Sequence, residues 1–396
     1  MRANRTAAIG KRVVIHFPGF EKMETSGHYR RFQRTAEQTA NLWDFSVEVG
    51  PLEANRSGAG FAVTAGADTW QTQSLIHICD HDAVVDALAA RPLASRLLSG
   101  FRSAAQVVAH GGLIGYVRHG WRFALFFIFP FLLMLCGLAF TLGLAVAPLR
   151  LSLSAWHCLW SVPLAACFFR YALMPFAERY YTLHLFSDWE FAVAVAKGDA
   201  PYLRRFLDEA VATLLRALDE AADEYVISSH SMGSSLATHA LGIVLERHPE
   251  ALAGKRVVFV TLGGAILQCA LLRSAVDLRR RVGLIAQTPN VSWLEVQCLT
   301  DPINFYKSKV VAVTGHPSAP QAALIAIRVK NLLSPERYAR IKRDFLRVHR
   351  QYVLNADRRG SFDFTVLTTG PFPADLTSDL TTRSFGEQMA NSDAVR

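Results

Sequence analysis

Two long stretches without a charged residue set the strongest constraint on how this chain can fold. The first runs from Phe123 to Ala147 and the second from Leu151 to Phe169, with Pro148-Leu149-Arg150 between them. As a helix, the first stretch would be roughly 37 Å long, enough to cross a hydrocarbon core of about 30 Å. One such stretch could be a buried core helix or a lid. Two in tandem, joined by a tight turn, predict a transmembrane helical hairpin over residues 118–176.

The composition agrees with a membrane segment attached to a globular body. Hydrophobic residues make up 51% of the 396 residues and charged residues only 19%, with a formal net charge of +9. The basic residues are scattered or flank the apolar stretches, which favours an anionic membrane surface over nucleic acid as partner. Arg118 and Arg122 precede the hairpin, Arg170 and Arg179 follow it, and only Arg150 lies in the turn. The positive-inside bias therefore predicts an integral protein of a bacterial-type inner membrane, with its globular body in the cytoplasm.

Other sequence-wide features argue against several classes of protein. None of the six cysteines forms a CxxC pair, and three of them lie in apolar stretches, which predicts reduced, buried thiols. Met1 to Arg12 is basic but lacks the apolar run of a signal peptide. His77, Cys79 and His81 alternate along one predicted strand, yet ordinary polar alternation explains them better than a metal site. With no Walker loop, dinucleotide fingerprint or HExxH motif, we expect neither a cofactor nor a metal.

Strand and helix patterns alternate through the rest of the chain. Short β-prone runs predict strands at 12–17, 45–49, 61–65, 74–79, 225–228, 257–261, 291–299 and 324–329. Helical patterns occur at 28–43, 82–99, 202–222, 234–247 and 334–345. This alternation predicts an α/β domain with a mostly parallel sheet flanked by helices, built from residues 1–117 and 177–372 around the inserted hairpin. The polar segment 373–396 is expected to be a disordered tail.

The most informative motif is Ser229-His230-Ser231-Met232-Gly233, between a predicted strand and a predicted helix. A sharp turn in that context is typical of a nucleophile elbow, which strains the serine backbone and projects its hydroxyl above the sheet. Small residues are needed two positions before and after the serine. Gly233 fills the second position, and Ser229 replaces the usual glycine at the first. The alternative is a helix N-terminus in which Ser229 or Ser231 is only an N-cap. We predict that Ser231 is the nucleophile.

This motif resembles the H-S-M-G elbow of α/β-hydrolase lipases and esterases. The run Val13-Val14-Ile15-His16-Phe17-Pro18-Gly19-Phe20 resembles the early strand of that superfamily, which ends in a turn carrying the oxyanion hole. The resemblance covers about residues 12–117 and 177–372, and its motifs are specific for the fold but weak for the substrate. It implies an α/β-hydrolase-like fold. It also implies an oxyanion hole made of the backbone N–H groups of Phe20 and Met232.

The chain order that the resemblance implies is serine, then acid, then histidine. Asp301 comes just after the predicted strand 291–299, where the triad acid belongs. The alternatives are an ordinary Asp-Pro turn, or Glu295 within the strand as the acid. His349 is the preferred base because it follows the strand expected to be last. His316 is the alternative base, and it would require residues 310–314 to be the last strand. The non-catalytic alternative for His349 is a surface histidine at the end of a helix.

Three functions are compatible with these residues. The first is a membrane-anchored serine hydrolase that cleaves an ester or thioester, with lipids among its candidate substrates, through an acyl-enzyme on Ser231. An acyltransferase would use the same triad with another acceptor. A non-catalytic membrane scaffold with a degenerate elbow is the third. The oligomeric state is left open. Transport is disfavoured, because the two apolar stretches contain no acidic or basic side chain other than His157.

Overall fold

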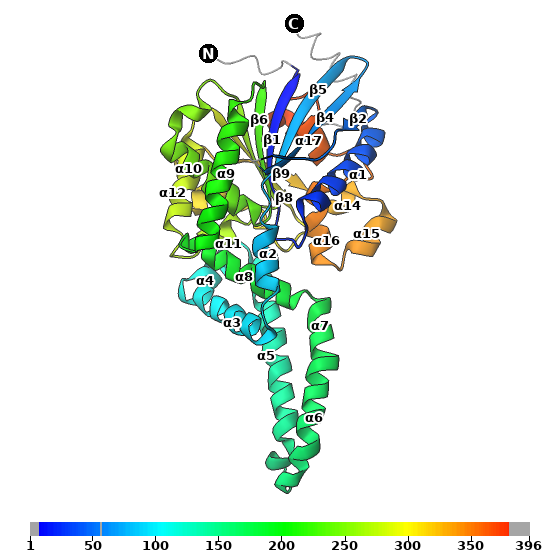
Figure 1. Ribbon diagram of the computed structural model, residues 1–396, viewed down its shortest axis with the longest axis vertical. Coiled ribbons are helices and arrows are strands. Elements are labelled where there is room, and N and C mark those ends of the chain that lie inside the picture. The colour runs from blue at the N-terminus through cyan, green and yellow to red at the C-terminus, as the bar shows by residue number, and fades with distance from the viewer. Residues whose placement is uncertain (1–7, 56–57, 380–396) are drawn as a thin grey trace. The chain divides into compact units, whose positions relative to one another are not determined.

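A computed structural model describes residues 8–55 and 58–379 (Figure 1). The chain forms two compact units. The sheet unit contains the residues up to 85 and those from 194 onward, and the helical unit contains residues 86–193. The helical unit is thus larger than the 118–176 insertion expected from the sequence. The described helices are α1 (Thr25–Trp43), α2 (Asp82–Ala89), α3 (Leu93–Ala109), α4 (Gly112–His119), α5 (Trp121–Arg150), α6 (Cys158–Phe168), α7 (Met174–Arg179), α8 (Thr182–Lys197), α9 (Pro201–Asp219), α10 (Gly233–Arg247), α11 (Ile266–Ala270), α12 (Val276–Gln287), α13 (Val310–Val313), α14 (Val329–Leu332), α15 (Pro335–Ile341), α16 (Phe345–His349) and α17 (Phe364–Thr369).

A single mostly parallel sheet forms the centre of the sheet unit. Its strands are β1 (Lys11–Phe17), β2 (Ser46–Val49), β3 (Glu53–Asn55), β4 (Gly58–Ala67), β5 (Trp70–Ile78), β6 (Glu224–His230), β7 (Val257–Leu262), β8 (Val291–Cys298) and β9 (Ala323–Ile327). Their order is β2-β4-β5-β1-β6-β7-β8-β9, with β3 paired to β4. The strands from β5 to β9 in that order are parallel, whereas β2, β3 and β4 make antiparallel pairs at one edge. The expected α/β class with a mostly parallel sheet is confirmed.

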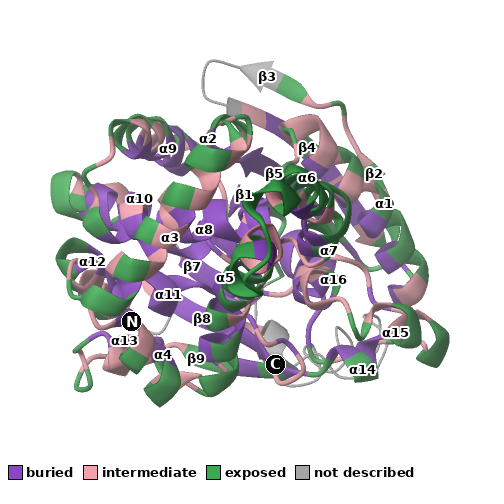
Figure 2. Cartoon of the chain, turned by 90° about the horizontal axis from the view of Figure 1, so that it is seen from below, coloured by how far each residue is buried: buried purple, intermediate pink, exposed green. Residues whose placement is uncertain are grey.

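Helices cover both faces of this sheet (Figure 1). One face carries α9, α10 and α12, and the other carries α1 and the helices from α14 to α17. The strands β6 and β7 are buried along their whole length, as the central strands of a parallel sheet covered on both faces must be. In Figure 2 the buried strands contrast with helices whose outer faces are exposed. Burial of both faces explains why these strands appear in the sequence as short apolar runs without alternation.

Some boundaries differ from the sequence expectation for local reasons. The helix expected at 82–99 is divided into α2 and α3 by a break that includes Pro92. The helix expected at 334–345 divides into α15 and α16, and residues 310–313 form α13 rather than a strand. The prediction that disorder begins at residue 373 is wrong for the first residues of that segment. Ala374–Asp379 is a 3₁₀ helix whose Asp375 pairs with Arg256, while residues 380–396 lie outside the described part of the chain, as do residues 1–7.

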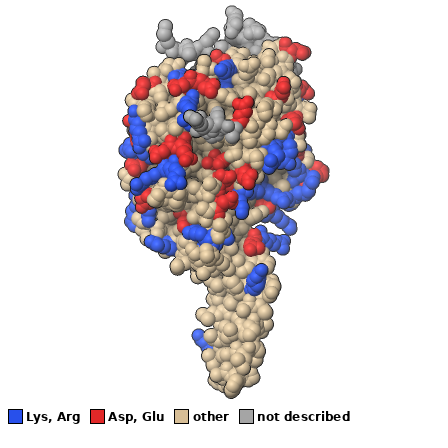
Figure 3. Space-filling model, viewed as in Figure 1, with Lys and Arg blue, Asp and Glu red and all other residues tan. Residues whose placement is uncertain are grey.

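The helical unit contains two long apolar helices that lie side by side. The first is α5, and the second continues from Ala155 to Arg179 through α6, a π-helical turn at Phe169–Leu173 (η2) and α7. Both are long and apolar enough to cross a membrane. Because α5 extends through Arg150, the turn falls at residues 151–154 and not at Pro148-Leu149-Arg150. In the view of Figure 3 the hairpin surface is nearly free of charged side chains.

Smaller helices pack around the beginning of α5. An aromatic cluster joins Tyr116 of α4 and Trp189 of α8 to Phe123 and Phe127, with ring centroids 4.7–5.7 Å apart. Phe101 of α3 reaches the ring of Phe131 at 6.1 Å. Farther along α5, apolar side chains such as Leu135, Phe140 and Leu142 are more than half exposed. The hairpin therefore has a packed base and an apolar surface that no described residue covers.

Candidate active site

Ser231 lies in the sharp turn between β6 and α10. Its φ is +53°, a left-handed backbone conformation that non-glycine residues rarely adopt. Three hydrogen bonds hold it there. Its N–H donates to the carbonyl of Leu262 at 3.1 Å, and its own carbonyl accepts from the N–H groups of Ser234 and Ala265 at 3.0 Å. Ser231 is partly exposed although the residues on either side of it are buried. Strain of this kind persists only where the surroundings impose it, and it is concentrated at functional sites.

The packing of the turn explains the small residues on either side of the serine. A Cβ on Gly233 would lie 2.2 Å from the carbonyl oxygen of Phe17, so only glycine fits. Ser229 is fully buried, and its hydroxyl donates to the carbonyl of Val260 at 3.0 Å. A serine can therefore occupy the position where glycine is usual, because its hydroxyl has an acceptor in the neighbouring strand.

Replacing Gly233 by alanine is expected to destabilise the sheet unit. The new methyl group cannot avoid two backbone carbonyls unless β1 or α10 shifts, and forced overpacking of a core costs about 1–3 kcal/mol. Chemical denaturation of the detergent-solubilised protein measures this loss. Gly143→Ala is the control, because a Cβ there would meet nothing within 4 Å. Equal stability of the Gly233→Ala variant and the native chain would contradict this account of the elbow.

The structure brings Asp301 and His349 together. Nδ1 of His349 lies 2.7 Å from Oδ2 of Asp301, and both side chains are buried. The carboxylate also accepts hydrogen bonds from the N–H of Ile303 and from the Tyr352 hydroxyl. Burial acts to raise the pKa of Asp301, but His349 and these donors outweigh it and hold that pKa below its ordinary value. Nε2 of His349 is buried and bonds to no described residue. The pair thus offers an oriented imidazole with one nitrogen available.

A second histidine, His230, links the elbow to this pair. The ring of His230 lies 4.7 Å from that of His349, and its Nε2 donates to the His349 carbonyl at 3.0 Å. Burial, together with the neighbouring His349, lowers the pKa of His230 to about 3, so this ring stays neutral beside His349. Because His230 directly precedes Ser231 in the chain, this contact places His349 beside the elbow segment. No hydrogen bond joins the Ser231 hydroxyl to His349 among the described residues.

The turn after β1 lies directly against the elbow. A Cβ on Gly19 would be 3.1 Å from Cβ of Ser231, so the absence of a side chain lets the Gly19-Phe20 backbone approach the serine. No described residue accepts a hydrogen bond from the N–H of Met232. The role expected of the Phe20 and Met232 N–H groups as oxyanion donors stays a prediction.

Sequence reasoning missed an ion-pair cluster beside this turn. The buried Glu21 carboxylate pairs with Arg31 of α1 at 2.9 Å and with Arg350 at 3.1 Å. Burial acts to raise the pKa of Glu21, but the two guanidinium groups lower it to about 2. Because Glu21 follows Phe20 and Arg350 follows His349, this carboxylate ties the turn to the histidine segment. A lone glutamate after a turn gave no signal of that role.

The other sequence candidates lie elsewhere. Nε2 of His316 bonds to the carbonyl of Arg279 at 2.9 Å, and the ring packs on Gly283 of α12. Glu295 is buried within β8, where burial raises its pKa to about 7. Among the described residues, no hydrogen bond or ion pair joins it to His349. The structure therefore pairs Asp301, which follows β8, with His349 and not with His316.

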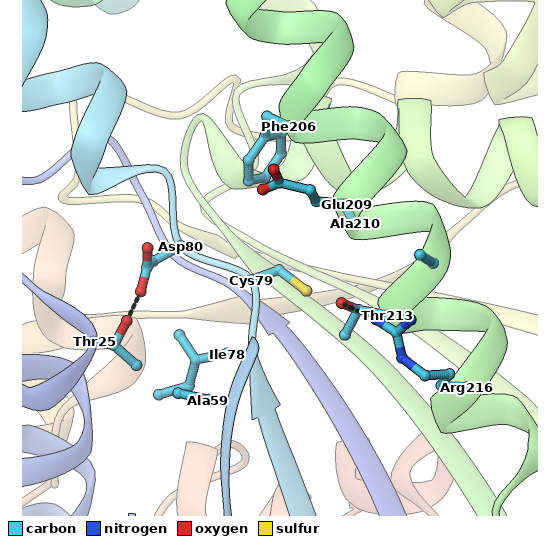
Figure 4. A pocket seen from close by; sticks show the side chains of 11 residues that line it. Thr25, Ala59, Ile78, Cys79, Asp80, Phe206, Glu209, Ala210, Thr213 and Arg216 are labelled. Carbon is cyan, nitrogen blue, oxygen red and sulfur yellow. Dashed lines mark hydrogen bonds between the residues drawn. The ribbon is translucent and has the colours of Figure 1, made fainter. Parts of the chain in front are cut away.

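The described residues also line a separate cavity of about 390 Å³ between the end of β5 and α9 (Figure 4). Thr25 donates a hydrogen bond to Asp80 at its edge, and burial with the neighbouring Asp82 raises the pKa of Asp80 to about 7. Cys79 lines this cavity, but His77 and His81 do not. Ser231, Asp301 and His349 are absent from the lining. Among the described residues no group of three His, Cys, Asp or Glu side chains is placed to hold a metal ion.

Comparison of the chain with protein-family models, with curated proteins and with solved structures finds no match. Any assignment of chemistry to this site therefore depends on its geometry and on the motif that first indicated it.

Proposed function

We propose that this protein is a membrane-anchored serine hydrolase of the α/β-hydrolase type, which cleaves an ester or thioester through an acyl-enzyme on Ser231. One observation supports this most strongly. The strained serine of a strand–turn–helix elbow occurs in the same sheet unit as a buried Asp301–His349 pair whose second imidazole nitrogen is unbonded. A helix N-cap needs neither the left-handed serine nor the oriented histidine.

The proposed reaction follows from the role of each group. Nε2 of His349 removes the Ser231 proton as the oxygen attacks the substrate carbonyl carbon, and the carbonyl oxygen becomes an oxyanion. The N–H groups of Met232 and Phe20 donate to that oxyanion. The imidazolium, stabilised by Asp301, protonates the leaving alcohol or thiol as its bond to the carbonyl carbon breaks. Water then attacks the acyl-enzyme with His349 again as base. Serine and histidine approach on substrate binding, because catalytic hydrogen bonds are often loose in unliganded sites.

The hairpin supplies the membrane part of the proposal. Between Leu132 and Arg150 the helix α5 would extend roughly 28 Å, close to the thickness of a hydrocarbon core of about 30 Å. The ring of Phe140 contacts that of Phe168 on the second helix, with centroids 4.8 Å apart, so Arg170 lies at about the level of Phe140 or slightly toward the base. In the proposed membrane, the charged end of an arginine side chain at that depth would have to reach the headgroup region. Anchored in this way, the enzyme would meet acyl lipids where they partition.

Turnover of model esters tests this function. Purified protein in nanodiscs is given p-nitrophenyl esters and acyl thioesters of increasing chain length. The native chain should show a burst of one nitrophenol per site followed by slower turnover, since the acyl-enzyme accumulates when deacylation is slower than acylation. Ser231→Ala should abolish both phases. Ser229→Gly, which restores the residue usual at that position, is the matched control and should retain the burst.

The same assay separates the two alternatives. If added alcohols or amines accelerate release and become acylated, the enzyme is an acyltransferase with the same triad. If the folded native chain gives neither burst nor turnover with any ester or thioester, the scaffold function replaces the catalytic one.

A further inference from the structure

The base of the hairpin carries an exposed surface of unusual composition. Between Asp86 and Glu178 the chain has no aspartate or glutamate. Several large apolar side chains of this part are more than half exposed: Leu98 (73%), Val108 (51%), Ile114 (75%), Val117 (57%) and Trp121 (62%). Arg102, Arg118 and Arg122 are exposed among them. An apolar patch with interspersed basic groups on a soluble surface is uncommon and marks an interaction site.

The spacing shows that these side chains form continuous stripes. On α3 the exposed positions 94, 98, 102, 105 and 108 recur at intervals of three or four residues, which places them on one side of the helix. On α4 the exposed positions Ile114, Val117 and Arg118 follow the same rule, and after the break at Gly120 the exposed Trp121 and Arg122 begin α5. The opposite sides are occupied, because Phe101 and Tyr116 turn inward to the aromatic cluster at the hairpin base. The stripes are therefore the outer faces of packed helices.

We propose that this base surface, made of Leu98, Arg102, Val108, Ile114, Val117, Arg118, Trp121 and Arg122, lies in the membrane interface and binds anionic phospholipid. The inference rests on the proposed membrane hairpin, which it extends from an anchor to a lipid-recognising surface. Two arguments select this occupant. First, α3 and α4 pack on the part of α5 that immediately precedes its exposed apolar length, so the surface is continuous with the segment proposed to enter the bilayer. Second, Arg102, Arg118 and Arg122 belong to a stretch of the sequence without aspartate or glutamate, and such a basic stretch complements lipid phosphates and the negative leaflet surface.

The composition also matches the chemistry of an interface. Tryptophan is enriched at the headgroup level, and Trp121 precedes the long apolar helix with Arg122 over its ring at 5.6 Å. Each basic residue near an anionic membrane favours the membrane-bound state of a protein surface over its released state by roughly fivefold. Three arginines therefore give selectivity for anionic over zwitterionic lipid.

Lipid quenching of site-specific fluorophores tests the proposal on the full chain. Cysteine is introduced as Leu98→Cys or Ile114→Cys in a chain whose exposed or half-exposed Cys136, Cys158 and Cys167 are replaced by alanine, leaving only buried native thiols. Each variant is labelled with bimane and placed in nanodiscs of phosphatidylcholine alone or mixed with phosphatidylglycerol, both doped with a lipid bearing a nitroxide high on its acyl chain. Val276→Cys on α12, at a position 63% exposed in the sheet unit, is the matched control.

We expect strong loss of fluorescence at positions 98 and 114, more in anionic nanodiscs, and none at 276. Replacing Arg102, Arg118 and Arg122 by glutamine should remove the difference between the two lipids. Unquenched label at both positions overturns the proposal, and equal quenching in both lipids overturns its anionic specificity. A chain that keeps only Cys136 of the three distinguishes the two failures. If the label on Cys136 is quenched while the labels at 98 and 114 are not, the proposal of a lipid-binding base surface fails but the membrane hairpin stands. If the label on Cys136 is also unquenched, the membrane hairpin is refuted as well.

Discussion

Replacing His349 by alanine is expected to slow ester hydrolysis by roughly 10³-fold or more while the protein stays folded. The reason is that Nε2 of His349 is the proposed proton acceptor for Ser231, and no other described imidazole is oriented by Asp301. Steady-state kinetics with the best p-nitrophenyl ester measures the effect. His316→Ala is the control, and it should leave turnover nearly unchanged because that ring bonds to the Arg279 carbonyl.

The acid can be tested in the same series. Asp301→Asn should keep the shape of the pair but favour the wrong imidazole tautomer, with a loss of about 10³–10⁴-fold in turnover. Because the pKa of Asp301 is lowered, the native carboxylate stays ionised as pH falls well below neutrality, so protonation of Asp301 should not limit turnover in that range. Its stabilising effect is present above the ordinary aspartate pKa and is lost as pH falls through the lowered folded pKa. A His316→Ala chain as slow as the His349→Ala chain would refute the assignment of the base.

Two arginines placed on the exposed side of α5 should release the protein from membranes. Leu135 and Leu142 are 54% and 64% exposed, with no charged residue near them in sequence. An arginine at the centre of a membrane helix costs about 2.5–3.5 kcal/mol, so the Leu135→Arg/Leu142→Arg chain loses several kcal/mol of insertion energy. Membrane fractions washed with alkaline carbonate should retain the native chain and lose the double variant.

A matched control separates membrane insertion from general damage. Leu324→Arg adds a charge at a position 45% exposed on β9 of the sheet unit, and it should stay with the membrane fraction. Release of the native chain by carbonate would contradict integral insertion. Both flanks are expected on the cytoplasmic side, so a cysteine-accessibility map that places Arg118 and Arg179 on opposite faces would refute the hairpin.

The sequence was most informative where local physics determines the structure. Continuous apolar runs predicted the buried parallel strands, and charge-free length predicted the two long helices. The elbow was visible because its steric demands fall on adjacent residues, such as Gly233 beneath the Phe17 carbonyl. Asp301 was found because the carboxyl end of a parallel strand is a recurrent place for side chains that act at a site.

Other features depend on contacts that no local pattern records. Glu21 meets Arg350 across more than three hundred residues, and His230 contacts the His349 carbonyl only after both segments fold. Ala374–Asp379 looked disordered because it is polar, yet Asp375 gains Arg256 as a partner and the N–H of Ala374 donates to Glu224. The helical unit was underestimated because α3 and α4 are amphipathic rather than wholly apolar, and aromatic side chains on their inner faces pack on α5.

Covalent labelling with a fluorophosphonate tests the central claim most directly. A serine held at an elbow beside an oriented base should be phosphonylated, with the fluoride leaving as the oxygen–phosphorus bond forms. Mass spectrometry of the digested native protein is expected to find the adduct on Ser231, and Ser231→Ala should show none while remaining folded. A folded native chain that stays unlabelled, or labelling that persists undiminished in Ser231→Ala, would contradict the proposal that this protein is a serine hydrolase.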